Sequence, residues 1–564
     1  MDKKVPTPLP IGNSIFEKVI EKGCYYVDKT LLIKDILDSG TEVILCTRPR
    51  RFGKTLNQTM LKCFFENTTQ IGGKDTKALF KGLKIENAGA EYLEHQGKYP
   101  VIFLSFKDVE RDTLERTLTE FKNLIANEFR RHSYVAEKMA DRNDKELFEK
   151  IAACEGSYDE YTRSIKFLSE CLNAYYGKKA IILIDEYDVP LNRAHINGFY
   201  KELIAFVRPL LSNTFKDNKY LQLSVITGCL RISKESIFTG LNNLSIISIL
   251  NKDYAEYFGF TQNEIDALLA HYGLESKAQE VREWYDGYMF GNTEVYNPWS
   301  SLNVVRSWIV YADEYPKPYW VNTSGNDIVR KLISEADSEM RADLEILMSG
   351  GTISKEVHED VTYDEIDKNS DNLWNFLFFT GYLKKVGERK EGVKIFLDLS
   401  IPNSELQYIY ETKISEWFKE QIKQKDFRQF YSAILSGNAE IIQKELGDLL
   451  LDTISYFDSQ EAFYHGFMLG ILAGQPNFSV KSNRESGKGR SDIIMRHLSK
   501  RAQAVIFELK WTDNIREIAA KAEEALRQID EKLYCKELED EGYDSKNILK
   551  YGIAFCKKDC EVKT

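Results

Sequence analysis

Residues 43–55 read VILCTRPRRFGKT, an apolar run followed by a basic turn and the start of a helix-like segment. A phosphate-binding loop needs a tight turn at a helix N-terminus, a lysine for the β- and γ-phosphates, and a hydroxyl for Mg²⁺. Gly53, Lys54 and Thr55 supply the second half of that pattern. Arg48 stands where the motif requires its first glycine. The motif predicts nucleotide binding, and a basic turn that only caps a helix is the alternative.

A second signal is IILIDEYD at residues 181–188, where an apolar strand ends in adjacent carboxylates. At the carboxyl end of a parallel strand, Asp185 is placed to hold Mg²⁺, directly or through water, and Glu186 to polarise an attacking water. Thr227 ends the next apolar run, where a polar side chain would contact the γ-phosphate, and Arg231 is a second candidate there. The alternatives are a surface acidic turn and a threonine that only caps a strand. Together with the basic loop, these patterns predict ATP binding.

The first half of the chain alternates apolar runs with helix-like stretches. Most of the runs are continuous, as in strands of a parallel sheet that is buried on both faces. This alternation predicts a doubly wound α/β domain over residues 1–250. The expected strands are 43–47, 101–106, 180–185, 221–227 and 244–250, and the expected helices are 55–67, 113–132, 164–176 and 198–212.

The pattern changes after residue 250. Residues 251–400 hold helical segments and aromatic-rich turns, which predict a mostly helical domain with a winged helix as one candidate form. A helical run at 406–424 then opens a third domain of α+β character, residues 401–564. The strands expected in it are 478–481, 491–496, 502–509 and 549–555, with a charged helix at 513–534.

Several sequence blocks occur together: YYVDKT (25–30), RPRRFGKT (48–55), LIDEYD (183–188), SIFTGLNNL (236–244), and WYDGY with YNPWS. In combination they resemble the AAA-ATPase-like family that is often fused to a PD-(D/E)XK nuclease, and the resemblance spans nearly the whole chain. It implies an additional-strand P-loop ATPase core in which Arg48 is a family variation rather than a broken site. It also implies that Tyr26 and Asp28 lie near the nucleotide base. The candidate nucleotide-binding residues are Arg48, Arg51, Phe52, Gly53, Lys54, Thr55, Asp185 and Thr227, with Glu186 as the catalytic residue and Thr55 and Asp185 as Mg²⁺ ligands.

The third domain contains GRSDIIM at 489–495 followed by AVIFELK at 504–510. Asp492 enters one strand, and Glu508 and Lys510 lie two residues apart on the next, so that both charged side chains project to one face. Carboxylates from adjacent strands can hold Mg²⁺, and a nearby lysine can position or help deprotonate the attacking water. This is the D…ExK pattern of PD-(D/E)XK phosphodiesterases. A solvated Glu–Lys pair is the alternative, and the family resemblance favours the nuclease.

Accessory positions of this site lie on the flanking helices. Glu461 opens EAFYHGFMLGIL and is a candidate third metal ligand, although a glutamate at a helix start also offsets the helix dipole. Gln528 and Tyr534 resemble a Gln…Tyr element that contacts nucleic acid in some members of the family. His465, one turn after Glu461, is interpreted as a packed core residue.

The composition limits the class of protein. The 564 residues carry 76 Lys and Arg against 87 Asp and Glu, a formal net charge of −11, which excludes a uniformly basic nucleic-acid binder. Nine scattered cysteines without CxxC or CxxH spacing favour a reducing cytoplasm over a disulfide framework or zinc ribbon. The opening residues lack the apolar core of a signal peptide, and no apolar run approaches the ~18 residues of a membrane span. We therefore expect a cytoplasmic protein without membrane contact.

Positive charge is concentrated in two places. Seven basic and two acidic residues between 481 and 501 give +5 beside Asp492, and three arginines join Lys54 at the phosphate loop. Such patches neutralise phosphates and give salt-dependent, largely sequence-independent affinity, whereas a solvated loop is the alternative at 481–501.

These patterns predict an ATP-binding, ATP-hydrolysing protein that regulates or powers a Mg²⁺-dependent nuclease acting on DNA, with ATP and Mg²⁺ as cofactors. The alternative is a nucleotide-switched signalling or scaffold NTPase whose C-terminal domain binds nucleic acid without cleaving it. DNA is favoured over RNA as the nucleic-acid partner, and assembly into a homo-oligomer is a further possibility.

Overall fold

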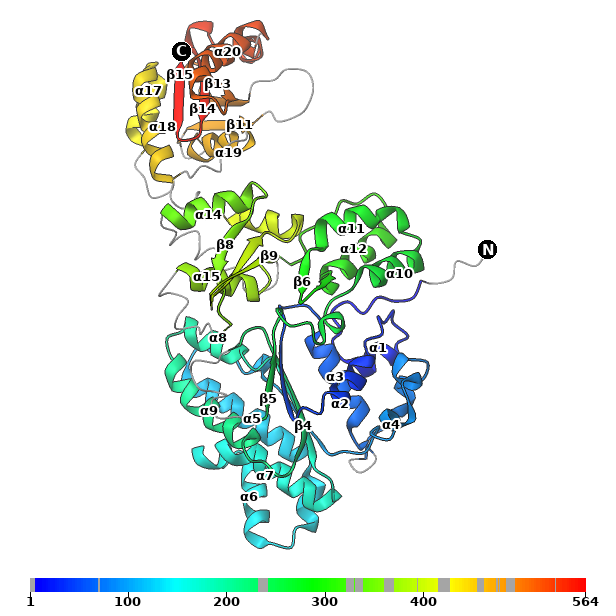
Figure 1. Cartoon of the computed structure of the whole chain (residues 1–564). Coiled ribbons are helices and arrows are strands. Elements are labelled where there is room, and N and C mark those ends of the chain that lie inside the picture. Colours follow the sequence, from blue (N-terminus) through cyan, green and yellow to red (C-terminus); the bar gives the residue numbers. More distant parts are fainter. Residues whose placement is uncertain are drawn as a thin grey trace. The chain divides into compact units, whose positions relative to one another are not determined.

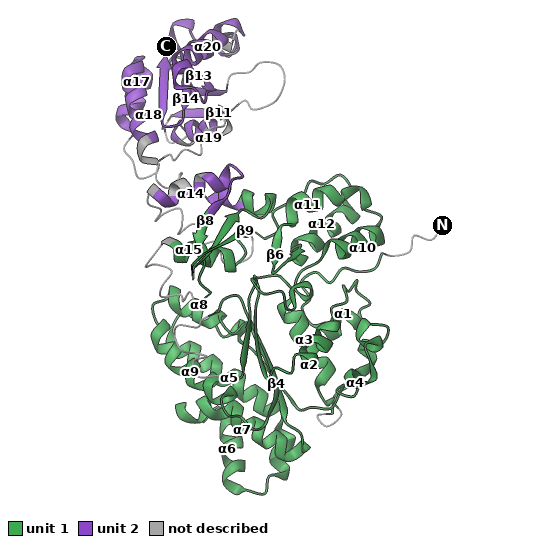
Figure 2. Ribbon diagram, viewed as in Figure 1, with its two compact units in different colours: residues 1–324, 354–408 green, residues 325–353, 409–564 purple. Residues whose placement is uncertain are grey.

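The protein is described by a computed structural model. It covers residues 6–68, 72–231, 242–320, 329, 338–359, 370–392, 394–413, 427–453, 461–472, 475, 477–482, 492–532 and 534–564. Two compact units are distinguished, residues 1–324 with 354–408 and residues 325–353 with 409–564 (Figure 2). The finer division at residues 250 and 400 stays a prediction.

The core of the first unit is a five-stranded parallel sheet with the strand order β2-β3-β4-β1-β5 (Figure 1). Nearly all side chains of its first four strands are buried, because helices cover both faces, and this explains the continuous apolar runs. The predicted α/β domain is confirmed. One strand, β4, lies between β1 and β3, as the additional strand implied by the resemblance. The strands are β1 (Val43–Thr47), β2 (Val101–Ser105), β3 (Ala180–Asp185), β4 (Leu221–Gly228) and β5 (Leu244–Ile247).

Helices flank this sheet (Figure 1). Helix α7 begins at Tyr158, six residues before the predicted start, because Ser157 and Glu160 form a reciprocal capping box there. Helix α6, which was not predicted from the sequence, is capped in its first turn by the side chain of Asp141. The main helices are α1 (Phe16–Glu21), α2 (Leu31–Asp38), α3 (Lys54–Phe65), α5 (Leu114–Arg131), α6 (Arg142–Ala152), α7 (Tyr158–Tyr176), α8 (Val189–Ile196) and α9 (Tyr200–Phe215).

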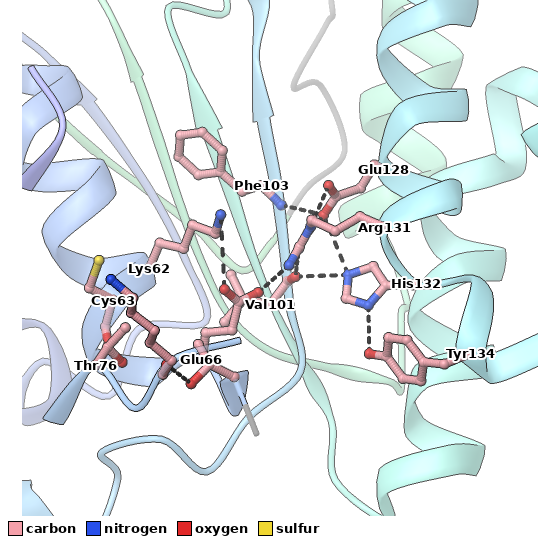
Figure 3. A network of polar contacts seen from close by, with 12 residues as sticks. Lys62, Cys63, Glu66, Thr76, Val101, Phe103, Glu128, Arg131, His132 and Tyr134 are labelled. Atoms are coloured by element: carbon pink, nitrogen blue, oxygen red, sulfur yellow. Dashed lines mark hydrogen bonds and ion pairs between the residues drawn. The ribbon is translucent and has the colours of Figure 1, made fainter. Parts of the chain in front are cut away.

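The end of α3 that lies away from the basic loop is held by a buried polar network (Figure 3). The Arg131 guanidinium lies between two carboxylates that are almost fully buried, and it donates to Glu66 and Glu128. His132 extends the network, with Nε2 3.2 Å from the Val101 carbonyl. Because these charges are paired, the network ties α3 to β2 and α5 without leaving a buried charge uncompensated.

The first unit continues into a helical middle region, as the sequence predicted. It includes a hairpin and a three-stranded sheet of order β8-β10-β9. Helix α10 starts at a capping box formed by Thr261 and Glu264 and ends at Gly273, whose φ of 70° suits a helix terminus. The elements are α10 (Gln262–Tyr272), α11 (Ala278–Tyr285), β6 (Tyr288–Phe290), β7 (Thr293–Val295), α12 (Pro298–Val310), β8 (Ile353–Glu356), α15 (Ser370–Phe379), β9 (Lys384–Glu391) and β10 (Lys394–Ser400).

The second unit contains a mixed sheet of order β11-β12-β13-β14-β15, in which only β13 and β14 are parallel. The predicted α+β character is confirmed, and the structure adds the final strand β15. Apolar residues of α17, α18 and α19 pack on the sheet and form the core. The elements are α14 (Ser338–Met348), α17 (Arg428–Ser436), α18 (Ala439–Thr453), α19 (Glu461–Leu472), β11 (Phe478–Ser482), β12 (Ile493–His497), β13 (Ala504–Trp511), α20 (Ile518–Glu531), α21 (Tyr534–Asp540), β14 (Ile548–Cys556) and β15 (Asp559–Lys563). Across the described parts of the chain, no helix combines the length and hydrophobicity needed to span a bilayer.

Candidate functional site

The basic loop between β1 and α3 ends at a helix N-terminus that no side chain caps. Gly53 precedes the helix with φ of 82°, and Arg51 adopts φ of 71°, which is uncommon for a residue with a side chain. Within the described residues, the backbone N–H groups of Lys54 and Thr55 have no hydrogen-bond acceptor. Such unpaired donors at a helix start are the groups that bind phosphate.

Asp185, at the end of β3, is fully buried, and both of its carboxylate oxygens accept hydrogen bonds from threonine hydroxyls. Thr55 Oγ1 lies 2.7 Å from Oδ2, and Thr227 Oγ1 lies 2.6 Å from Oδ1. Because β4 separates β1 from β3, Thr227 at its carboxyl end bridges the loop and the acidic strand. A hydroxyl in contact with a carboxylate is the donor set that Mg²⁺ takes beside a nucleotide, so these residues fit the ion.

Lys54 is the first residue of α3, directly after the loop, and is only 4% exposed. Its ammonium donates to the carbonyl oxygens of Arg48 and Pro49, each at 2.9 Å. Burial acts to lower the pKa of Lys54, but the neighbouring Cys229 and the surrounding carboxylates raise that pKa above its ordinary value. The side chain therefore stays charged, as a phosphate ligand must.

Glu186 directly follows Asp185 but is partly exposed, with a positive φ of 51°. Its charge acts on both Lys54 and Arg51 across the loop. A carboxylate in this position can orient a water molecule for attack on a terminal phosphate.

The Arg48 side chain points into the protein. It is fully buried, and its guanidinium donates to the carbonyl oxygens of Thr47, Ile247 and Asp253 at 2.9, 3.2 and 3.1 Å. The arginine in the place of the first motif glycine thus ties the loop to the end of β5. Its backbone N–H donates to the Gly228 carbonyl oxygen at 3.0 Å, so a nucleotide contact by Arg48 stays a prediction.

Aromatic residues of the middle region pack directly on the loop. The ring of Phe52 is buried against Tyr288 and Phe290, with ring centres 4.9 and 5.1 Å away. The Arg51 guanidinium lies 4.3 Å from the centre of the Trp299 ring. Since Tyr288 belongs to WYDGY and Trp299 to YNPWS, both blocks contribute to the shape of the loop.

Other candidates around the loop have protein partners. Arg231 Nη1 lies 3.0 Å from Glu359 Oε2 in the middle region. Asp28 accepts hydrogen bonds from Thr30 through one carboxylate oxygen and from the Lys84 backbone through the other. These contacts give Arg231 and Asp28 structural roles, and a nucleotide contact by either stays a prediction.

In the second unit, Asp492 and Glu508 meet where β12 begins and β13 nears its end. The Asp492 backbone N–H donates to Glu508 Oε2 at 3.2 Å, and Asp492 Oδ2 accepts from the Leu509 N–H at 2.8 Å. Glu508 is 2% exposed. Lys510 is partly exposed and projects to the same face of β13 as Glu508, because they are two residues apart on a strand.

The electrostatics of this pair fit a bound cation. Burial raises the pKa of Glu508 to about 7, and the charge of Asp492 adds to the effect, whereas Lys510 and Lys532 oppose it. A divalent cation would relieve the repulsion between the carboxylates and favour their ionised forms. Over the described residues, no group of three or more His, Cys, Asp and Glu side chains has the geometry to hold a metal. The side chain of Glu461, the candidate third ligand, lies outside the described residues.

Two family models match this chain. Residues 10–238 match a family described as a predicted AAA-ATPase, and residues 459–564 match the PD-(D/E)XK nuclease superfamily. The chain carries an AAA-ATPase-like domain and a C-terminal PD-(D/E)XK nuclease domain. Both domains indicate enzymatic activity.

Individual proteins show weaker similarity. An uncharacterized protein in the vnfD 5′ region of Azotobacter chroococcum mcd 1 is 27% identical over 405 residues, which cover 71% of this chain and 68% of that protein. The Aeropyrum pernix ORC2 protein, solved as ADPNP and ADP complexes, is 10% identical, and the match covers 73% of this chain and 97% of that chain. Its TM-score is 0.22, which supports no inference.

The nuclease domain has positioning contacts that the sequence did not reveal. Gln528 of α20 donates to Glu508 Oε1, and His465 Nε2 lies 3.0 Å from the Asp492 carbonyl oxygen. Gly552 pairs with Glu508 across β13 and β14, and a Cβ on Gly552 would lie 2.3 Å from the Ala522 carbonyl oxygen. The glycine therefore lets α20 approach closely enough for Gln528 to reach the site. An isolated glycine in a strand was the one available signal.

The basic patch expected beside the nuclease site is partly occupied by protein contacts. Arg496 Nε lies 3.1 Å from Glu541 Oε2, and Lys500 donates to the Glu541 carbonyl oxygen. Residues 483–491, which include three more of the basic positions, lie outside the described residues. The side chain of Tyr534 also lies outside them. Phosphate binding by this segment stays a prediction.

The raised pKa of Glu508 makes the nuclease domain's stability depend on pH. With a pKa of about 7 against an ordinary 4.5, the folded domain keeps a proton that the unfolded chain releases. This protonation stabilises the folded domain by at most about 3 kcal/mol. The stabilisation is complete below the pKa of Glu508 in the unfolded chain and is lost as the pH rises through its pKa in the folded domain. In EDTA, we expect the free energy of unfolding to fall more steeply between pH 5 and 8 for the wild type than for Glu508→Gln.

Chemical denaturation at each pH measures this difference. Glu531→Gln, at an exposed position on α20, is the control and should follow the wild type. Equal slopes for the wild type and Glu508→Gln would contradict the raised pKa.

Proposed function

We propose that this chain is an ATPase whose nucleotide state regulates a Mg²⁺-dependent nuclease that cleaves DNA. The observation that carries the proposal is a repeated chemical set: each domain brings two acidic side chains and a lysine together. In the ATPase-like domain these are Asp185, Glu186 and Lys54, and in the nuclease domain Asp492, Glu508 and Lys510. Both sets suit reactions at phosphorus, in which negative charge must be neutralised and a water oriented.

At the ATPase site, the chain's own groups divide the work. Lys54 and the unpaired N–H groups at the start of α3 bind the phosphate oxygens. Thr55 and Asp185 would hold Mg²⁺, which supplies charge neutralisation for the β- and γ-phosphates. Thr227 fixes the Asp185 carboxylate through its 2.6 Å hydrogen bond, and Glu186 orients the attacking water.

At the nuclease site, Asp492 and Glu508 would hold Mg²⁺, which polarises the scissile phosphate and lowers the pKa of water. Lys510 lies on the same strand face, where it would position the attacking water or help deprotonate it. Gln528 and His465 keep the two carboxylates in place through Glu508 Oε1 and the Asp492 backbone.

A single set of incubations tests this assignment. Purified protein is mixed with single- and double-stranded DNA and RNA, with and without Mg²⁺ and ATP, while strand cleavage and phosphate release are followed. We expect Mg²⁺-dependent DNA cleavage and ATP-dependent phosphate release. If DNA is bound but stays intact, a nucleotide-switched scaffold is favoured. If only RNA is cleaved, RNA rather than DNA is the substrate.

A further inference from the structure

Tyr187 and Asp188 follow the candidate catalytic glutamate and connect two neighbouring strand ends. Asp188 precedes helix α8 and has the residue type that usually caps a helix, yet its side chain makes no capping bond there. Instead, Asp188 Oδ2 accepts from the backbone N–H groups of Cys229 and Leu230, at 2.9 and 3.1 Å. The side chain therefore binds the segment that follows β4 instead of capping α8.

Tyr187 contacts the same segment from both its backbone and its side chain. Its N–H donates to the Thr227 carbonyl oxygen at 3.0 Å, and its hydroxyl donates to the Leu230 carbonyl oxygen at 2.6 Å. The ring is fully buried. The turn after β3 and the end of β4 are therefore joined by four hydrogen bonds from two consecutive residues, an arrangement called here the 187–188 clamp.

Gly228 is the point of closest approach in this clamp. A Cβ on Gly228 would lie 2.6 Å from two ring carbons of Tyr187 and 2.8 Å from Asp188 Oδ1. The Gly228 carbonyl oxygen also accepts from the Arg48 N–H at 3.0 Å, at the start of the phosphate loop. The clamp consequently joins three segments of the site: the phosphate loop, the end of β4 and the turn that contains Glu186.

The backbone of Glu186 needs such support. Its φ of 51° lies in the left-handed region, which a glutamate adopts only when its surroundings impose it. The residue is fixed on its C-terminal side by the Tyr187 hydrogen bonds, and its carbonyl oxygen accepts from the Val189 N–H at 3.2 Å. From this position the charge of Glu186 acts on Lys54 and Arg51, whereas the preceding Asp185 stays buried on its two threonines.

We propose that Tyr187 and Asp188 are positioning residues of the ATPase site, which hold Glu186 in its left-handed conformation and fix the end of β4 against the phosphate loop. The inference rests on the proposed ATPase function for its catalytic consequence. It also makes a structural claim that holds without nucleotide. Neither residue is among the proposed phosphate ligands. Tyr187 acts through Glu186 and the β4 end, and Asp188 acts there and through its charge on Lys54.

Two conservative variants test the clamp, and each has a matched control. Tyr187→Phe removes one hydrogen bond from a hydroxyl to a carbonyl oxygen. Its control, Tyr158→Phe, removes a similar 2.8 Å bond to the Ala205 carbonyl oxygen, outside the clamp. Asp188→Asn weakens acceptance from two backbone N–H groups, and Asp141→Asn does the same at the start of α6, where the distances are 2.8 and 3.0 Å.

The first readout is amide hydrogen exchange of the nucleotide-free protein over residues 221–231. We expect the Cys229 and Leu230 amides to exchange about fivefold faster or more in Tyr187→Phe and Asp188→Asn, because each loses part of the clamp. The two controls should exchange as the wild type does. Unchanged exchange in both clamp variants would overturn the proposal.

The second readout is ATP hydrolysis with a separate measurement of nucleotide Kd. We expect kcat to fall about tenfold or more in the clamp variants while Kd changes less than about threefold. In a Glu186→Gln background, Tyr187→Phe should lower kcat by a smaller factor than it does in the wild type, because part of its effect passes through Glu186. Additive losses would overturn the positioning role. A wild type that binds but never hydrolyses ATP would refute the proposed function, and the exchange data would still decide the clamp.

Discussion

Replacement of Lys54 by methionine is expected to raise the Kd for ATP by at least about 100-fold. The lysine is buried, stays charged, and lies between the loop carbonyls and the carboxylates of the acidic strand. Loss of its charge-assisted bonds to phosphate oxygens costs about 3 kcal/mol or more, which corresponds to that change in affinity. Isothermal titration with ATP and Mg²⁺ measures the effect directly.

A matched substitution on the same helix separates this effect from general damage. Lys62 lies on α3, has a side chain that is 29% exposed, and pairs with Glu66 at 3.9 Å. We expect Lys62→Met to bind ATP as the wild type does. Replacement of Lys54 leaves two loop carbonyl oxygens unpaired, and thermal unfolding of both variants measures the stability that is lost. Unchanged ATP affinity in a folded Lys54→Met protein would contradict the nucleotide site.

The second large effect is expected at the nuclease site. Asp492→Asn and Lys510→Met should each lower DNA cleavage by about 1,000-fold or more, because the first weakens metal binding and the second removes the cation nearest the attacking water. The rate of strand cleavage over a range of Mg²⁺ concentrations measures the loss, and the Kd for ATP should not change in either variant.

The helix beside the site offers a control for this experiment. Asp530 of α20 is exposed and pairs with Lys550 at 2.7 Å, so Asp530→Asn removes a carboxylate without touching the Asp492–Glu508 pair. We expect it to cleave DNA at the wild-type rate. Cleavage that survives both Asp492→Asn and Lys510→Met would refute the assignment of these residues.

The sheet of the ATPase-like domain was largely predictable because its strands are short, continuous apolar runs. The predicted strand 180–185 coincides with β3, and the one at 43–47 coincides with β1. The approach of Thr55, Asp185 and Thr227 also follows from sequence order, since the carboxyl ends of parallel strands share one edge of a sheet. Strand β15 was missed because charged and apolar residues alternate in it over only five positions.

Side-chain direction was less predictable than the position along the chain. Arg48 and Phe52 lie in the phosphate-loop motif, yet tertiary packing turns both side chains into the protein. The contacts of Gln528 with Glu508 and of Asp188 with Cys229 join residues 20 and 41 positions apart, and no local pattern indicates such pairs. The role of WYDGY and YNPWS depends on the tertiary contacts of Tyr288 and Trp299 with the loop, which the sequence does not show.

In the proposed function, nucleotide binding at the first site governs cleavage at the second. Its most direct test is the rate of DNA cleavage in Mg²⁺, with and without ATP, for the wild type and Lys54→Met. We expect ATP to change the wild-type rate by about tenfold or more and to leave the Lys54→Met rate unchanged. A wild-type cleavage rate that is the same with and without ATP would contradict it.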